Sequence, residues 1–124
     1  ILGNLIGALV ARQRFERARE VALQCPQRLG RLGLGEQLWV SLDALALLHL
    51  HEDRTALAAQ LAGVADREFE IHGQMQRQPN EAVDRNALAA GLARRLSAAE
   101  ISRLELEGRR MGLSEAMARA FELD

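Results

Sequence analysis

The segment "LALLHLHEDRTALAAQLAGVA", Leu45 to Ala65, consists of two helical patterns joined by a short polar turn. A similar segment, "LIGALVARQRFERAREVALQC", Leu5 to Cys25, begins 40 residues earlier, and at this shift Gln13 coincides with Asp53 in the turn. The other coincident pairs are Leu5 with Leu45, Ala18 with Ala58, and Ala22 with Ala62. Small residues at fixed places allow antiparallel helices to pack closely, and stacked hairpins bury a shared core. The pattern therefore predicts two helical hairpins related by a repeat.

The composition indicates an all-α fold in one domain. At 124 residues the chain is long enough to bury a core without disulfides or structural metal ions. Apolar residues make up 48% of it, but aromatic residues only 3%, and tyrosine is absent. Alanine and leucine dominate instead, and both lose little entropy in a helix. Few β-branched residues are left from which strands could form.

Apolar residues recur at spacings of three and four along most of the chain, which is typical of amphipathic helices. We expect a single domain, 1–124, of six or seven helices stacked as antiparallel hairpins. Pro26 is expected to end the second helix, and Gly63 or Gly73 to bend or end the fourth. The expected parts are a first hairpin over 1–26, a loop over 27–35, a second hairpin over 36–76, and C-terminal helices with an end cap over 80–124.

Helix-capping signals are clearest in the last third of the chain. Ser97 and Glu100 form the S-x-x-E pattern of a capping box, and the residues that flank it, Leu96 and Ile101, have the spacing of a hydrophobic staple. We expect a helix from there to about Met111. The remaining capping predictions are Gly112 as a left-handed helix end, Ser114 as the cap of a final short helix, and Asp53 or Thr55 as the cap of the fourth helix.

The histidines, the cysteine and the glycine-rich loop do not have the spacing of a chemical site. His49 and His51 are two residues apart and so lie on different helix faces, while His72 belongs to another helix. Shared metal ligation is therefore not expected. Cys25 is the only cysteine and has no motif around it, and the three glycines between 30 and 35 follow no predicted strand.

Carboxylate pairs are also present without the setting of an active site. Glu52 and Asp53 are predicted at a turn, and Glu105 and Glu107 on opposed helix faces, so solvated charge is the expected state of both pairs. The sequence thus predicts no catalytic, cofactor-binding or metal-binding residue. We do not expect an enzyme, and no cofactor is implied.

Three apolar side chains and two arginine clusters are the candidates for partner contact. Trp39 is expected in the core, with a partner-binding anchor as the alternative, and Met75 and Met111 are also expected in the core. The clustered arginines are Arg12, Arg14, Arg17, Arg19, Arg94, Arg95, Arg109 and Arg110. They could bind an acidic peptide or an anionic effector, but neighbours such as Glu16 and Glu20 favour paired surface charges. The sequence does not identify which residues bind a partner.

The charge balance argues against nucleic acid as the partner. The chain has 16 basic and 17 acidic residues, a formal net charge of −1, and no lysine. A domain that binds phosphates should carry a clear basic excess. No apolar run is long enough for a membrane span, and a lone cysteine implies no disulfide. We expect a cytoplasmic fragment of a longer protein, since the chain begins at Ile1 without a signal sequence.

The repeated hairpin resembles the tetratricopeptide repeat. Phe15 and Ala18 match the aromatic residue and alanine of that family's second helix, and Ile6 and Ala46 stand where its first helix has glycine or alanine. The spacing of 40 exceeds the family's 34, so the resemblance makes the glycine-rich loop at 30–35 an insertion.

The second half, roughly 36–123, is similar to the tetratricopeptide-like tail of bacterial signal-transducing ATPase regulators with winged-helix or LuxR-type DNA-binding domains. Its "AAQLAGVA", Ala58 to Ala65, resembles the family's "A-A-x-L-x-G-A-A", and its closing stretch resembles "EGR-x-(M/L)-S-L-E-E-A". The matching residues there are Glu107, Gly108, Arg109, Met111, Ser114, Glu115 and Ala116. The resemblance implies a repeat module that receives a signal and binds a protein or a small effector.

Two other functions remain open at this point. The segment from Ser97 also echoes a LuxR-like helix-turn-helix, but its recognition helix should then follow Phe121, where three residues remain. If the last helix itself read DNA, it would present Glu115 and Arg119 among small apolar residues. A dimerisation module, with a homodimer as its product, is the other alternative. In the helical-array interpretation, the last helix folds back to cover an apolar face with Met117, Ala120 and Phe121.

Overall fold

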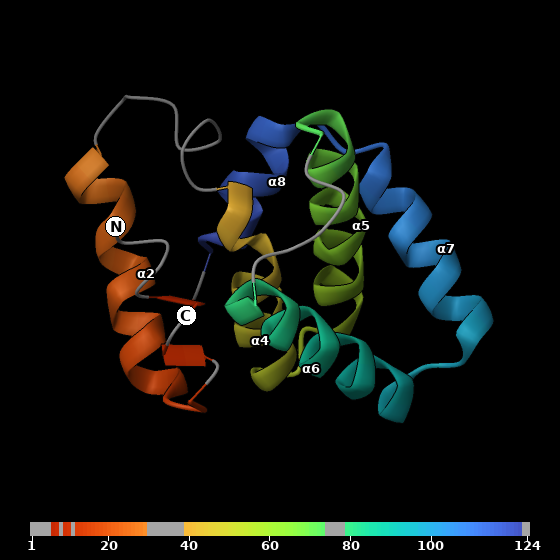
Figure 1. Cartoon of the computed structure of the whole chain (residues 1–124), viewed down its shortest axis with the longest axis horizontal. Coiled ribbons are helices and arrows are strands. Elements are labelled where there is room, and N and C mark those ends of the chain that lie inside the picture. Colours follow the sequence, from red (N-terminus) through yellow and green to blue (C-terminus); the bar gives the residue numbers. More distant parts are fainter. Residues whose placement is uncertain (1–5, 8, 11, 30–38, 74–78, 123–124) are drawn as a thin grey trace.

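The computed structural model describes residues 6–7, 9–10, 12–29, 39–73 and 79–122, and every regular element within these ranges is helical (Figure 1). The elements are α2 (Phe15–Leu29), the 3-10 turn η1 (Trp39–Ser41), α4 (Leu42–His51), α5 (Thr55–Ile71), α6 (Pro79–Arg95), α7 (Ala98–Arg109) and α8 (Leu113–Ala120). The all-α prediction is confirmed, because six α-helices pack together and the described ranges contain no strand.

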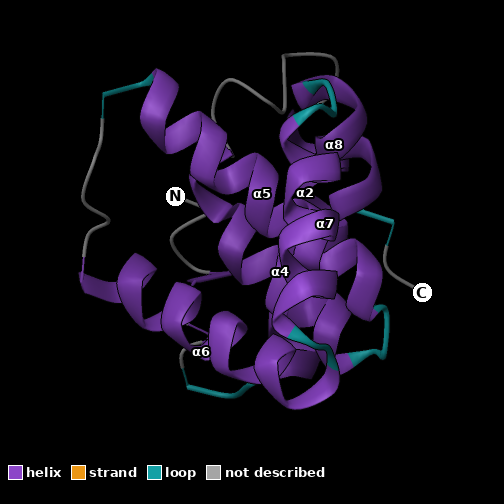
Figure 2. Ribbon diagram, turned by 90° about the vertical axis from the view of Figure 1, so that its right-hand side faces the viewer, coloured by secondary structure: helices purple, strands orange, loops and turns teal. Residues whose placement is uncertain are grey.

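Helix α4 is the centre of the packing. It contacts α2, α5, α6 and α8, which surround it in the two views of Figures 1 and 2. Every residue from 42 to 50 is buried. Apolar residues occur on every side of α4, as expected of an enclosed helix, and Asp43 and His49 are buried with them. Helix α5 packs against α4 and also against α7, so two rows form, one joining α4 to α6 and the other joining α5 to α7.

The 40-residue repeat is present in the geometry of the turns. Gln13 and Asp53 both have left-handed backbone, with φ of 60° and 67°. The backbone N–H of Gln13 donates to Val10 O and that of Arg14 to Leu9 O, while Asp53 donates to Leu50 O and Arg54 to His49 O. Both sets form the double hydrogen bond of a Schellman motif. The predicted pairing of these turns is confirmed, and the small residues Ala18, Ala22, Ala58 and Ala62 are all fully buried.

Replacing Gln13 by glycine is expected to stabilise the protein by about 1 kcal/mol, because glycine adopts the left-handed conformation without the steric cost of a side chain. Gln13 is exposed and is better suited than Asp53 to this substitution, since replacing Asp53 would also remove the hydrogen bond that it accepts from Arg95. Urea unfolding of Gln13→Gly measures the change. Gln13→Ala is the matched control and should change the free energy of unfolding by only a few tenths of a kcal/mol. A net loss of stability in Gln13→Gly would contradict the assigned turn.

The prediction that Pro26 ends the second helix is wrong, since α2 continues to Leu29 and takes in the first residues of the predicted loop. Proline lacks one N–H, and its ring crowds the carbonyl four residues earlier, but its own φ is helical. Because Pro26 lies within the last turn of α2, only the bond to the carbonyl of Ala22 is lost there. The rest of the predicted loop, 30–35, lies outside the described residues, as do the ends of the predicted second hairpin at 36–38 and 74–76.

Several predicted helix ends also differ from the structure. Gly112 is not left-handed but extended, with φ −64° and ψ 147°, and it is the N-cap of α8, which places Ser114 inside that helix. Arg54 is the N-cap of α5 and its side chain makes no capping hydrogen bond, so neither Asp53 nor Thr55 caps that helix. Gly73 follows the end of α5 and has left-handed backbone, with φ 70°. The prediction that Gly73 could end this helix is therefore confirmed.

The capping box at the start of α7 is confirmed. Ser97 Oγ accepts the backbone N–H of Glu100 at 3.1 Å, and Glu100 Oε1 accepts the backbone N–H of Ser97 at 3.1 Å. This bond from the Ser97 backbone lowers the pKa of Glu100. Leu96 and Ile101, the predicted staple, are both partly buried against the core. A strong local signal was sufficient to place this helix start.

Helices α5 and α7 approach so closely that their backbones touch at two glycines. A Cβ atom added to Gly63 on α5 would lie 2.0 Å from the carbonyl oxygen of Glu105 on α7. A Cβ added to Gly108 on α7 would lie 1.8 Å from the carbonyl oxygen of Gln60 on α5. Gly63 therefore does not bend α5 but allows contact with α7. The two stretches that carry the family resemblance, Ala58–Ala65 and Glu107–Ala116, face each other through these glycines.

Helix α8 folds back as predicted, but onto an inner part of the molecule. Met117, Ala120 and Phe121 are buried, and the main contacts of α8 are with α4 and α5 rather than with α6 and α7, which precede it. His49 on α4 holds its end, since the ring Nε2 lies 2.8 Å from Ala120 O. Helix α8 makes no main contact with α6, where Val83 is 52% exposed.

Candidate functional site

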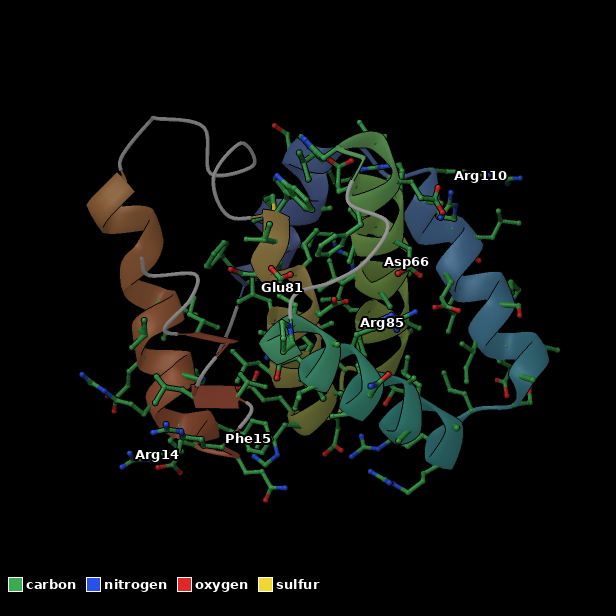
Figure 3. All side chains as sticks on the ribbon, in the orientation of Figure 1. Arg14, Phe15, Asp66, Glu81, Arg85 and Arg110 are labelled. Carbon is green, nitrogen blue, oxygen red and sulfur yellow. The ribbon has the colours of Figure 1, made fainter. Side chains whose placement is uncertain are left out.

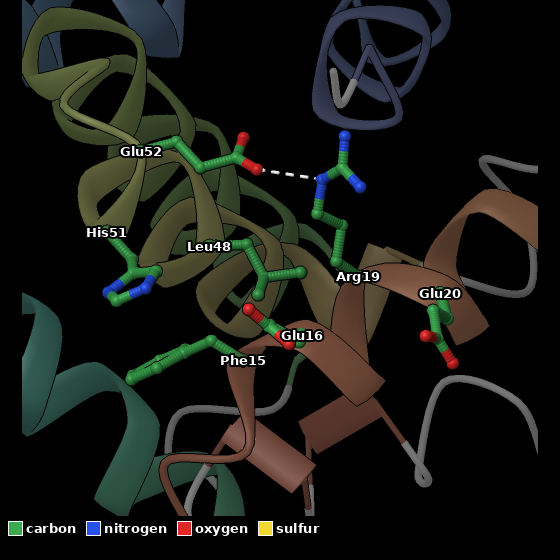
Figure 4. A pocket seen from close by; sticks show the side chains of 7 residues that line it. All are labelled: Phe15, Glu16, Arg19, Glu20, Leu48, His51 and Glu52. Carbon is green, nitrogen blue, oxygen red and sulfur yellow. Dashed lines mark hydrogen bonds and ion pairs between the residues drawn. The ribbon is translucent and has the colours of Figure 1, made fainter.

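Two neighbouring pockets lie on either side of a stacked ring pair, Phe15 on α2 and His51 on α4, whose centroids are 4.3 Å apart. The first, which we call the α2–α4 pocket, has a volume of about 480 Å³ (Figure 4). Its lining residues are Phe15, Glu16, Arg19, Glu20, Leu48, His51 and Glu52. None of these side chains carries a hydroxyl or thiol, so the pocket offers no serine- or cysteine-type nucleophile.

The charges at one side of the α2–α4 pocket belong to a hydrogen-bonded chain that reaches the core. Glu52 accepts from Arg19 Nε at 2.9 Å, the contact drawn in Figure 4, and from Arg54 Nη1 at 2.7 Å. Arg54 Nη1 also donates to His49 Nδ1 at 2.9 Å, so His49 is neutral, with its proton on Nε2 facing Ala120 O. Burial lowers the pKa of His49, and the charge of Arg54 lowers it further. Each member of this chain is already engaged, which indicates a structural role.

The second pocket, which we call the α4–α6 pocket, has a volume of about 380 Å³ and a more apolar lining. The end of the N-terminal helical segment, the start of α2, α4 and α6 all contribute to it. Its lining residues are Val10, Gln13, Phe15, Leu47, Leu50, His51, Val83, Asp84, Ala87, Gly91, Arg94 and Arg95. This volume lies in the range of small-molecule sites, and an apolar lining with a few polar groups is typical of them.

Asp84 is the unusual group of the α4–α6 pocket. It is 3% exposed, and burial raises the pKa of its carboxyl to about 7, with a further contribution from the negative charge of Asp43 on α4. Its Oδ1 accepts no hydrogen bond from any residue that the structure describes. Gly7 adjoins the other oxygen, since a Cβ added there would lie 3.4 Å from Oδ2. A buried carboxyl group beside a cavity is a recognised mark of a functional site.

The predicted pairing of surface arginines applies to half of the two clusters. Arg17 pairs with Glu20 at 2.9 Å, Arg109 with Glu70 at 2.6 Å, and Arg19 with Glu52 as described above. Arg95 donates to Leu50 O and to Asp53 Oδ1, both at 3.0 Å, and so caps the end of α4. The side chains of the other cluster members form no hydrogen bond or ion pair with a described residue; they are Arg12, Arg14, Arg94 and Arg110. Arg14 and Arg110 lie on opposite sides of the molecule in Figure 3, so they form no common anion site.

Two further arginines, outside the predicted clusters, join helices. Arg85 on α6 donates to Asp66 on α5 at 3.0 Å and to Glu105 on α7 at 2.9 Å (Figure 3). Arg67 on α5 donates to the carbonyl oxygens of Arg109 and Met111 at the end of α7. Both guanidinium groups are committed to internal contacts, which leaves them unsuited to ligand binding.

Of the remaining candidates, the structure describes Trp39, Met111, His49 and His51. Trp39 is in the core, as expected, and stacks on His72 at 4.4 Å between ring centroids. Met111 is half-buried and packs against the core. His49 is fully buried and His51 is exposed. The candidates outside the described part of the chain are Gly30, Gly33, Gly35 and Met75, and the side chain of Cys25 is not described either.

Among the carboxylates singled out in the sequence, Glu52 lines the α2–α4 pocket and is ion-paired rather than solvated, whereas Glu105 and Glu107 line neither pocket. Glu105 pairs with Arg85, and Glu107 accepts from Gln60 at 3.1 Å. The buried carboxylates Asp43 and Asp84 were missed, although a signal existed: Asp84 lies four residues before Leu88 and so extends the Leu88, Leu92, Leu96 ridge toward the core. Within the described ranges, no group of three or more His, Cys, Asp and Glu side chains could hold a metal ion.

Comparisons of the chain with family models, with curated proteins and with solved structures found no match. In the described ranges, no helix combines the length and apolar character that a membrane crossing requires.

Proposed function

We propose that this chain is a non-enzymatic helical repeat scaffold that binds a protein segment or an effector at the α4–α6 pocket. The observation that carries the proposal is the repeated Schellman turn, with Gln13 and Asp53 in the same left-handed conformation 40 residues apart. Repeated hairpins stack their first helices side by side, and that row lines an extended binding surface. In this proposal the row comprises residues 6–7 and 9–10, α4 and α6, and the α4–α6 pocket lies along it.

The resemblance to bacterial signal-transducing ATPase regulators gives this scaffold a biological setting. In such a cytoplasmic protein the repeat module receives the signal, while other domains hydrolyse ATP and bind DNA. Gly63 and Gly108 each lie against the backbone of the opposite helix, which supports a packing role for the two stretches that carry the resemblance. These stretches would then identify the module without forming its binding surface.

A DNA-binding role for the α7–α8 corner has less support. The apolar face of α8, with Met117 and Ala120, is buried against α4 and α5. Its exposed residues include Glu115, and an acidic side chain would meet phosphate unfavourably. Arg109, just before the corner, is engaged by Glu70. The formal net charge of −1 adds no general attraction to DNA.

Selection from a random peptide library should yield peptides whose binding depends on Val83. Val83→Arg is expected to lower the affinity for these peptides about tenfold or more, because it places a bulky charge at the pocket. Leu106→Arg is the matched control on α7: Leu106 is 50% exposed, close to the 52% of Val83, but does not line this pocket. Fluorescence anisotropy measures both affinities. Equal losses in the two variants, or a salt-sensitive shift of a DNA duplex at about 50 mM salt, would overturn the proposal.

A further inference from the structure

Asp84 places an acidic group beside an otherwise mostly apolar cavity. The side chain is more than nine-tenths buried, yet Oδ1 has no hydrogen-bond donor among the described residues. A buried polar atom without a partner costs about 1–3 kcal/mol, and more when it is charged. Each such group in a native structure requires an explanation, such as stored strain, a functional role, or a water molecule or ion that supplies the donor.

We propose that the α4–α6 pocket binds a small organic amine whose ammonium group pairs with Asp84 while its alkyl chain fills the apolar part of the cavity. The apolar wall is formed by Val10, Leu47, Leu50, Val83 and Ala87. An ammonium group supplies three N–H donors and a positive charge, so it satisfies the carboxylate and stabilises its ionised form. This inference does not depend on a peptide partner, and its test can fail while the peptide selection succeeds.

The charges around the cavity favour a cation at one end only. Asp43 on α4 adds a second buried negative group near Asp84, and a cation would relieve their mutual repulsion. At the other end, Arg94 and Arg95 lie ten and eleven residues further along α6, about 15 Å away by helix rise. His51, the other titratable group in the lining, is exposed and stacked on Phe15. The amine is therefore expected to enter with its charge toward Asp84.

A series of n-hexylamine, 1-hexanol and hexanoate tests the inference by isothermal titration of the whole chain. Hexylamine should bind with a dissociation constant of about 1 mM or below, and at least about tenfold more tightly than the other two. Asp84→Asn should lower the affinity for hexylamine about 10- to 100-fold, since it removes a charge-assisted hydrogen bond. Glu115→Gln, an exposed carboxylate on α8, should leave the affinity unchanged. Ala87→Leu should also weaken binding, because it fills the cavity without altering any charge.

Proton release distinguishes pairing with Asp84 from general apolar binding. At about pH 6 Asp84 is mostly protonated, so hexylamine binding should release about one proton, whereas at about pH 8.5 release should nearly vanish. Titration in two buffers of different ionisation heat measures this number. The inference is overturned if hexylamine does not saturate by about 10 mM, if hexanol binds as tightly, or if Asp84→Asn binds like the wild type.

Discussion

Gly63→Ala and Gly108→Ala are each expected to destabilise the protein by about 3 kcal/mol or more, at the upper end of the cost of overpacking. The added methyl group would meet a backbone carbonyl, 2.0 Å away at Gly63 and 1.8 Å away at Gly108. A carbonyl in the middle of a helix cannot rotate away as a side chain can. The whole of α7 would have to move from α5, and the contacts along both helices would be lost together.

Gly112→Ala is the matched control for both glycine variants. Gly112 lies in the corner after α7, has no atom within 4 Å of an added Cβ, and has φ −64°, which alanine adopts freely. Because Gly112 is the N-cap of α8, where alanine is less favourable than glycine, the effect of this variant should reach at most about 1 kcal/mol. Because one separation of the helices accommodates both methyl groups, the double variant Gly63→Ala/Gly108→Ala should cost less than the sum of the single variants. Urea unfolding measures all four, and a loss below about 1 kcal/mol at either glycine would contradict the close approach.

Asp84→Asn is expected to stabilise the protein increasingly as pH rises, with the gain over wild type growing by roughly 4 kcal/mol between about pH 4 and pH 8. Burial and Asp43 raise the pKa of Asp84 from 3.8 to about 7, so the folded state holds a proton that the unfolded chain has released. The favourable contribution of protonated Asp84 is complete below about pH 4 and is lost as pH rises through about 7. Asparagine has no charge to desolvate and keeps a similar shape.

The difference in the free energy of unfolding between Asp84→Asn and the wild type isolates the contribution of Asp84 from that of other titrating groups. His49 has the opposite dependence, because its lowered pKa reduces stability as pH falls below about 6.5, and this effect is common to both proteins. Free energies of unfolding measured across the pH range give the difference directly. A difference that does not change with pH would show that Asp84 is not buried as described.

The fold could be predicted from the sequence wherever a local pattern repeats or a capping motif is complete. The coincidence of Gln13 with Asp53 and the Ser97–Glu100 box are both of this kind, and both are confirmed. The left-handed conformation of Gln13 and Asp53 was not foreseen, because neither residue is glycine. The predicted helix ends at Pro26 and Gly112 were wrong, because a proline in the last turn removes only one backbone hydrogen bond and because Gly112 has the extended backbone of an N-cap.

The candidate site was harder to predict, because it depends on which helices become neighbours. Gly63 and Gly108 stand in recognisable stretches, but nothing in either stretch says that it faces the other. Asp84 could have been found on the leucine ridge of α6, whereas its neighbour Asp43 comes from a helix 41 residues earlier in the chain. Arg95, which the sequence suggested as a surface charge, caps α4 instead. Contacts between distant segments therefore set the chemistry of both pockets.

Methyl-resolved NMR of the protein, titrated with a peptide selected on the wild type, tests the proposed binding surface most directly. If the row of first helices forms the binding surface, the largest shifts should occur at Val10, Leu47, Leu50 and Val83, which line the α4–α6 pocket. The exposed methyl groups of Ile71 and Leu106 lie outside this pocket and should remain unchanged. Shifts centred on Ile71 or Leu106, with Val83 unaffected, would contradict the proposed binding surface.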